Sequence, residues 1–102
     1  MASNTGKTRT VVKTEKQVST PSLFKVLMHN DDYTTMEFVI EVLQSIFHKS
    51  TAEAEKIMLT IHFQGFGHCG TFPYAIAETK ADQVRRQARK AGFPLRCSLE
   101  EA

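Results

Sequence analysis

A run of three polar residues and one distant histidine carry the side chains best suited to binding a small charged group. Asn30, Asp31 and Asp32 directly precede an expected helix, and His62 lies at the edge of the apolar stripe of another. Short polar side chains in such a run commonly form turns and caps. Two adjacent carboxylates also repel each other, and a cationic ligand would relieve that repulsion. His62 fits either a solvated boundary position or a hydrogen-bond partner at the rim of an apolar pocket.

The other reactive side chains form weaker patterns. Candidate metal ligands are His29, His48, His68 and Cys69. Their spacing matches no common zinc motif, and neighbouring residues of a strand point to opposite faces. A cysteine hydrolase would need Cys69, His62 and Asp31, but no residue beside the thiol activates it and no oxyanion motif is present. We therefore expect no metal, no cofactor and no enzymatic activity.

The composition is that of one soluble domain, with 102 residues of which 41% are hydrophobic and 24% charged. The formal net charge is +2, and residues 1–20 contribute +3, which leaves −1 for the rest of the chain. The folded part is therefore not a strongly basic nucleic-acid binder. A cluster of cations, Arg85, Arg86, Arg89 and Lys90, fits a solvated helix face and keeps a small nucleic-acid-binding α+β domain as the alternative.

The sequence favours a cytoplasmic protein. No segment has the length of apolar residues that a membrane span or a secretory signal requires. Two cysteines, Cys69 and Cys97, do not make a disulfide framework, so we expect two buried thiols in a reducing compartment.

Capping boxes and turn residues predict where the elements lie. Leu23–His29 is mostly apolar and bounded by loop residues, which is typical of a strand. Thr34 and Glu37 form a capping box that predicts a helix from Thr34 to near His48. Its apolar stripe is Met36, Val39, Ile40, Leu43 and Phe47. Ser50 and Glu53 form a second capping box, and the helix that it opens should stop at Gly65. Its stripe is Ala54, Ile57, Met58 and Ile61.

The C-terminal third predicts a strand, a long helix and a final strand. Phe66–Phe72 reads as a short irregular strand, and a helix should run from Pro73 or Tyr74 to Ala91, before Gly92. Its stripe of small residues, Ala77, Ala81, Val84, Ala88 and Ala91, indicates close packing on a sheet. Residues 93–99 alternate as a half-buried strand does. The order is β-α-α-β-α-β, an α+β domain with three helices on one face of three strands. We assign residues 23–102 to this domain and residues 1–22 to a disordered extension.

One stretch of sequence resembles a known family. The motif Asn30-Asp31-Asp32-Tyr33-Thr34-Thr35-Met36-Glu37-Phe38-Val39 is similar to the ClpS family, the bacterial adaptors of the N-degron pathway that work with the ClpA unfoldase and the ClpP peptidase. Further matches are Met58, Ile61–Gly65, Cys69-Gly70, Ala77–Lys80 and Pro94-Leu95. The resemblance covers residues 21–101 and implies the same α+β core.

The resemblance also implies a function and a site. Residues matching Asn30, Asp31 and His62 would hold the free α-amino group of a substrate, with Asp32 supporting the loop. The large side chain of N-terminal Leu, Phe, Tyr or Trp would enter a pocket that matches Met28, Thr34, Met36, Val39, Met58, Ile61 and Leu95. An α-amino group is mostly cationic at neutral pH, so it suits the carboxylates.

Partners follow from the same resemblance. The chain should be a monomeric adaptor that docks through Glu78 and Lys80 on the N-terminal domain of a ClpA-type AAA+ unfoldase. Three positions differ from many relatives: Thr35 stands where proline is common, Ala75 stands where glutamate is common on the docking face, and Met28 stands where another aliphatic residue is common in the pocket. We expect Thr35 to loosen the start of the helix without changing its cap.

Overall fold

The computed structural model describes residues 21–102, and their six elements follow the predicted order β-α-α-β-α-β. The elements are β1 (Leu23–His29), α2 (Met36–Ser45), α3 (Thr51–Gln64), β2 (Phe66–Pro73), α4 (Tyr74–Ala91) and β3 (Arg96–Glu101). The α+β class is confirmed. The expected disordered extension lies outside the described residues, apart from Pro21 and Ser22.

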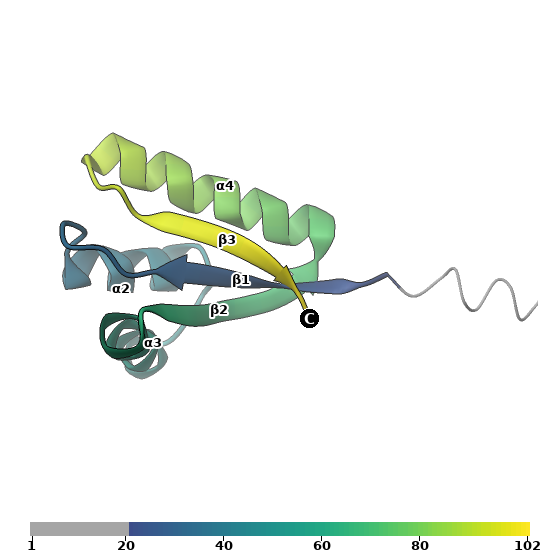
Figure 1. The fold of residues 1–102 in the computed structure, drawn as a ribbon, viewed down its shortest axis with the longest axis horizontal. Coiled ribbons are helices and arrows are strands. Elements are labelled where there is room, and N and C mark those ends of the chain that lie inside the picture. The colour runs from purple at the N-terminus through teal and green to yellow at the C-terminus, as the bar shows by residue number, and fades with distance from the viewer. Residues whose placement is uncertain (1–20) are drawn as a thin grey trace, which may run out of the picture.

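The three strands form one antiparallel sheet in the order β2-β1-β3. β1 is central, so within residues 21–102 the outer edges of β2 and β3 pair with no further strand. The long helix α4 packs on all three strands, α3 packs beside β2, and α2 packs on α3 (Figure 1). Among the described residues, no helix is both long and apolar enough to cross a bilayer.

The core lies between the sheet and the helices. Val26 and Met28 point into it from β1 and are fully buried, and Ala77, Ala81 and Ala88 of α4 are buried against them in one apolar cluster. Small side chains bring the axis of α4 close to the strands, as their spacing predicts. Both cysteines, Cys69 and Cys97, are free and buried, which confirms the predicted thiols.

The start of α3 follows its sequence signal closely. The Ser50 hydroxyl accepts a hydrogen bond from the Glu53 amide at 3.1 Å, and the Glu53 carboxylate accepts one from the Ser50 amide at 3.0 Å. The helix ends at Gly65, which has a left-handed φ of 97° that glycine adopts without steric cost. Both predicted ends of this helix are confirmed.

The start of α2 corrects the prediction by one residue. The N-cap is Thr35, whose hydroxyl accepts from the Phe38 amide at 3.1 Å, and the expected cap Thr34 belongs to the preceding loop. The expectation that Thr35 leaves the cap unchanged is therefore wrong. The helix ends at Ser45 rather than near His48, because the chain turns at residues 46–47 and His48 takes a left-handed φ of 56°.

Two apolar faces of α2 are buried instead of one. Val39 and Leu43 lie in the core as predicted, but Phe38 and Val42 are buried as well. The predicted single stripe missed them because α2 has neighbours on two sides, and the ring of Phe38 packs against Phe93 at 5.0 Å between centroids.

The last strand begins later than the alternation suggests. β3 starts at Arg96, and residues 93–95 instead close the end of α4. The Phe93 amide donates to the Ala88 carbonyl at 2.8 Å, so it is used by the end of α4 and is not free to pair with a strand. Pro94 has no N–H to donate to a ladder. These two residues delay sheet pairing to Arg96.

Candidate functional site

A hollow of about 250 Å³ lies where the β1–α2 loop meets α2 and α3. We call it the loop–α3 hollow, and its lining is Asn30, Asp31, Asp32, Thr34, Met36, Val39, Met58, Ile61 and His62. All four predicted amine-binding residues and five of the seven predicted pocket residues thus line one concavity. Its volume is below the roughly 300–1,000 Å³ typical of sites for drug-sized ligands, which suits a single side chain.

Asp31 organises the polar rim of this hollow. Its Oδ1 accepts hydrogen bonds from the amides of Tyr33 at 2.8 Å and Thr34 at 2.7 Å, and its Oδ2 accepts from the Thr34 hydroxyl at 2.7 Å. Burial raises the pKa of the Asp31 carboxyl, but these hydrogen bonds outweigh burial and leave its pKa below the usual value. The group is therefore an anion at neutral pH. A carboxylate offers about four acceptor sites, so Oδ2 retains one for a ligand.

Asp31 forms loop-supporting hydrogen bonds in addition to its expected role at the amine. The loop-supporting hydrogen bonds belong to Asp31, although the resemblance assigned support to Asp32. Asp32 is exposed, and within residues 21–102 its carboxylate has no hydrogen-bond partner. Both side chains face the loop–α3 hollow, so two negative charges stand at its rim.

A single backbone hydrogen bond joins the two halves of the site. The Asn30 amide donates to the Gly65 carbonyl at 2.9 Å, so the start of the loop is tied to the C-cap of α3. His62 lies in the last turn of α3, three residues before that cap. The loop residues and His62 come from distant parts of the sequence, and this contact fixes their separation.

Gly67 on β2 lies close to Ile61, one of the residues that line the hollow. A Cβ at this position would lie 2.7 Å from Cγ1 of Ile61 and 3.4 Å from the Ile57 carbonyl oxygen. Only glycine allows β2 to approach α3 this closely. The approach holds Ile61, which is 3% exposed, at the floor of the hollow, while Met36 at the mouth is 44% exposed.

Two predicted pocket residues lie elsewhere. Met28 is fully buried in the core, on the inner face of β1. Leu95 lines a different hollow, of about 280 Å³, with Arg85, Arg89, Phe93, Pro94 and Arg96. The resemblance placed both residues in the pocket, but neither lines the loop–α3 hollow.

A larger hollow lies outside the predicted site. It has a volume of about 400 Å³, lies between α3 and β2, and is lined by Lys49, Glu53, Lys56, Ile57, Thr60 and His68. Two lysines disfavour a cationic ligand there, and the carboxylate of Glu53 is already engaged by the Ser50 amide. An ammonium group therefore fits the loop–α3 hollow better.

The geometry does not support cysteine or metal chemistry. Burial raises the pKa of the Cys69 thiol to about 12, so almost no thiolate exists at neutral pH. The described part of the chain contains no group of three or more His, Cys, Asp or Glu side chains placed to hold a metal ion.

Comparison with known proteins identifies the family. Residues 19–98 match the family model described as "ATP-dependent Clp protease adaptor protein ClpS". The chain belongs to the ClpS family. Its similarity to the ATP-dependent Clp protease adapter protein ClpS of Shewanella loihica is 56% identity over 90 residues, which is 88% of each chain. With the protein of the same name from Nitratidesulfovibrio vulgaris it shares 51% identity over 87 residues, 85% of this chain and 87% of the other.

One solved structure matches most of this chain. Agrobacterium tumefaciens ClpS2 bound to L-phenylalaninamide has a TM-score of 0.79 and 38% identity, and the match covers 81% of this chain and all of that one. The ligand of that ClpS2 structure is an amino acid amide with a free amine and an aromatic side chain.

The two residues expected at the ClpS docking face have partners within the domain. The Glu78 carboxylate accepts a hydrogen bond from the Tyr74 hydroxyl at 3.0 Å. Lys80 is half-buried and its Nζ donates to the Ile46 carbonyl at 2.8 Å, above the rings of Phe47 and Phe72. Sequence analysis did not predict this contact of Lys80, because the carbonyl that accepts the hydrogen bond lies 34 residues away.

Proposed function

We propose that this chain is a non-enzymatic, monomeric, cytoplasmic adaptor that holds proteins with N-terminal Leu, Phe, Tyr or Trp and delivers them to a ClpA-type AAA+ unfoldase for degradation by ClpP. The observation that carries the proposal is the loop–α3 hollow, whose acidic rim and apolar floor suit a free amine and a large side chain together. Neither half of the hollow would select such a ligand alone.

Each part of the ligand has a matching group. The α-ammonium would receive charge-assisted hydrogen bonds from Asp31, with Asn30, Asp32 and His62 around it. The side chain would be buried against Val39, Met58 and Ile61, beside Met36 and Thr34. Burial of a large apolar side chain contributes about 1.5–3 kcal/mol. Met28 and Leu95 would support these contacts from the packing behind them.

Delivery would involve other parts of the chain. We assign docking on the N-terminal domain of the unfoldase to the face of α4 that carries Glu78 and Lys80. Residues 1–20 would enter the unfoldase pore during transfer of the substrate.

Peptide binding tests the proposed recognition of the substrate's N-terminal residue. Fluorescence anisotropy should show that a Phe-initiated peptide with a free amine binds at least about tenfold more tightly than its N-acetylated form, since a charged hydrogen bond contributes about 1.5–3 kcal/mol. Affinity should also fall as the pH rises above about 8, because the ammonium group, with a pKa of about 7.7–8.0, loses its proton. Equal affinity for free and acetylated peptides would refute the proposal.

A further inference from the structure

The hollow that contains Leu95 has a lining unlike that of the loop–α3 hollow. We call it the arginine hollow, and it consists of Arg85, Arg89, Phe93, Pro94, Leu95 and Arg96, with a volume of about 280 Å³. Three arginines and three consecutive residues, Phe93, Pro94 and Leu95, line it. Like charges gathered at one concavity repel each other, and an anionic ligand would relieve that repulsion.

Contacts within the domain account for only one of the three arginines. Arg85 donates from Nη2 to the Cys97 carbonyl at 3.0 Å, which holds α4 against β3. In residues 21–102, neither Arg89 nor Arg96 has a carboxylate within 4.0 Å, and the only ion pair there joins Arg86 to Asp82 at 3.2 Å. Arg89 in the last turn of α4 also complements the helix dipole, but Arg96 lies on β3, where no dipole explains it.

The arginine hollow is close to the proposed amine site. Arg96 is the cross-strand partner of His29, and such Cα atoms lie about 4.5–5.5 Å apart. Asn30 follows His29, so the backbone of Arg96 is within about 10 Å of it, a distance that about three extended residues span. Burial and the charge of Arg96 together lower the pKa of His29, so the positive charge of Arg96 acts on the residue that directly precedes the loop.

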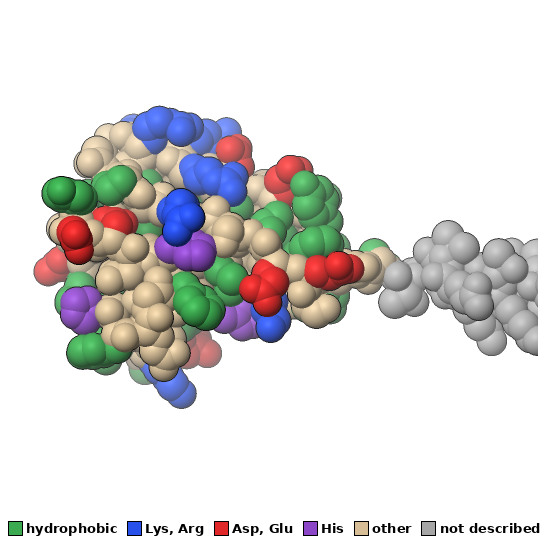
Figure 2. Space-filling model, in the orientation of Figure 1, with side chains coloured by type: hydrophobic (Ala, Val, Ile, Leu, Met, Phe, Trp, Pro, Cys, Tyr) green, Lys and Arg blue, Asp and Glu red, His purple; other side chains and the backbone are tan. Residues whose placement is uncertain are grey.

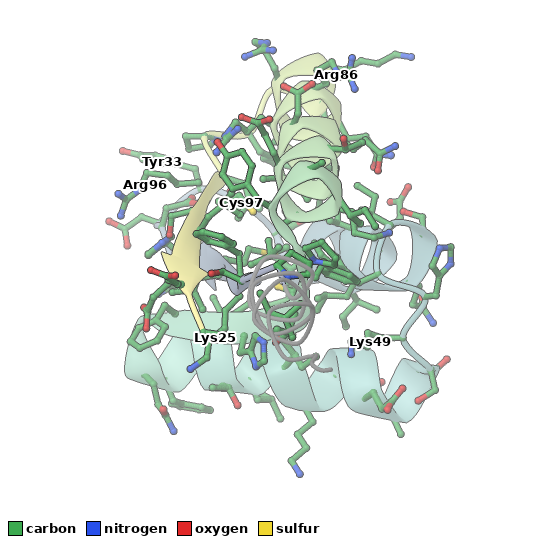
Figure 3. The ribbon with its side chains drawn as sticks, turned by 90° about the vertical axis from the view of Figure 1, so that its right-hand side faces the viewer. Lys25, Tyr33, Lys49, Arg86, Arg96 and Cys97 are labelled. Carbon is green, nitrogen blue, oxygen red and sulfur yellow. The ribbon has the colours of Figure 1, made fainter. Side chains whose placement is uncertain are left out.

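The figures agree with this placement. Figure 2 shows basic side chains over α4, and acidic side chains at the end of the molecule where the β1–α2 loop lies. Figure 3 shows Arg96 on the same flank as Tyr33 of that loop, whereas Arg86 projects from α4 away from the sheet. Arg96 thus lies at the same end of the domain as the acidic loop.

We infer that the arginine hollow binds carboxylate side chains of the substrate segment that follows its N-terminal residue, at about the third to sixth positions. This inference rests on the proposed function, because the α-amino group must first be anchored in the loop–α3 hollow. A substrate with a positive terminus followed by acidic residues matches the order of charges on the domain. Guanidinium groups suit carboxylates because their planar N–H donors match the two oxygens.

The test compares two Phe-initiated peptides that carry either Glu or Gln at positions 3–6. Each exposed ion pair contributes about 0.2–1 kcal/mol, so two arginines should give the Glu peptide roughly two- to thirtyfold higher affinity. The preference should disappear in the double variant Arg89→Gln/Arg96→Gln and persist in Arg86→Gln, a matched control that removes a cation outside the hollow. It should also shrink at about 1 M salt, where the screening length is about 3 Å.

Three results would overturn the inference: equal affinity of the two peptides for the parent protein, a preference that survives the double variant, or an equal loss in Arg86→Gln. N-acetylated versions of both peptides separate this failure from that of the proposed function. If both free-amine peptides bind equally and the acetylated ones do not, the arginine hollow fails and the adaptor function stands. If acetylation has no effect, the proposed function fails as well.

Discussion

Replacing Lys80 by methionine should destabilise the domain, even though this residue was expected to act at the docking face. Methionine keeps most of the apolar stem but removes the ammonium group that donates to the Ile46 carbonyl at 2.8 Å. Ile46 is buried and caps α2, so its carbonyl would lose a charged partner at the end of that helix. The contact links α4 to the C-terminal end of α2.

The contacts of Lys80 set the size of the effect. A hydrogen bond to a charged group contributes about 1.5–3 kcal/mol, and the lower value applies because the side chain is only half-buried. Its Nζ also lies 5.9 Å and 5.4 Å from the ring centroids of Phe47 and Phe72, where a cation–π contact contributes about 0.5–1 kcal/mol. We expect a loss of about 2 kcal/mol, which lowers Tm by roughly 8–16 °C in a domain of this size.

Circular dichroism during heating and urea titration would measure this loss. Lys56→Met is the matched control, because Lys56 is exposed on α3 and its ammonium group has no hydrogen-bond partner in residues 21–102. If Lys80→Met and Lys56→Met unfold at the same temperature as the parent, the assigned contacts do not stabilise the domain.

Glu78→Gln then tests docking separately, since Glu78 is exposed and its carboxylate bonds only to Tyr74 within the described residues.

Four further predictions concern the site and delivery. Asp31→Asn should weaken peptide binding about tenfold in anisotropy, because a neutral amide replaces the charged acceptor; unchanged affinity would place the amine elsewhere. Met36→Ala should open the mouth to β-branched N-terminal Val or Ile, and a peptide panel that ranks as for the parent would contradict this. Gly67→Ala should cost about 1–3 kcal/mol in urea unfolding, because its Cβ would meet Ile61 at 2.7 Å, and full stability would contradict the close approach. Deleting Met1–Thr20 should leave peptide affinity intact while stopping unfoldase-dependent degradation of a Leu- or Phe-initiated substrate, and undiminished degradation would exclude a role in delivery.

The fold was predictable wherever a local signal specified it. The reciprocal bonds of Ser50 and Glu53 and the left-handed Gly65 depend on neighbouring residues alone, so both ends of α3 follow from sequence. The start of α2 did not, because Thr34 and Thr35 can each cap a helix and the choice depends on the carboxylate of Asp31, which binds the hydroxyl of Thr34. Burial of Phe38 also depends on a distant partner, Phe93.

Most residues that line the loop–α3 hollow were predictable, but their contacts were not. The resemblance gave the loop residues and His62, and the structure places them around one hollow. Sequence could not show which aspartate supports the loop or that Lys80 is bonded to Ile46. Nor could it reveal the arginine hollow, because Arg96 joins the helix arginines only once β3 pairs with β1.

The bond between the Asn30 amide and the Gly65 carbonyl has a consequence for the thermodynamics of binding. It ties Asn30, at the start of the acidic loop, to the C-cap of α3, which would preorganise the proposed site. Little conformational entropy of the protein should then be lost when a peptide binds, and most of the ordering cost falls on the peptide. Association should accordingly proceed in a single kinetic phase, without a slow rearrangement of the adaptor.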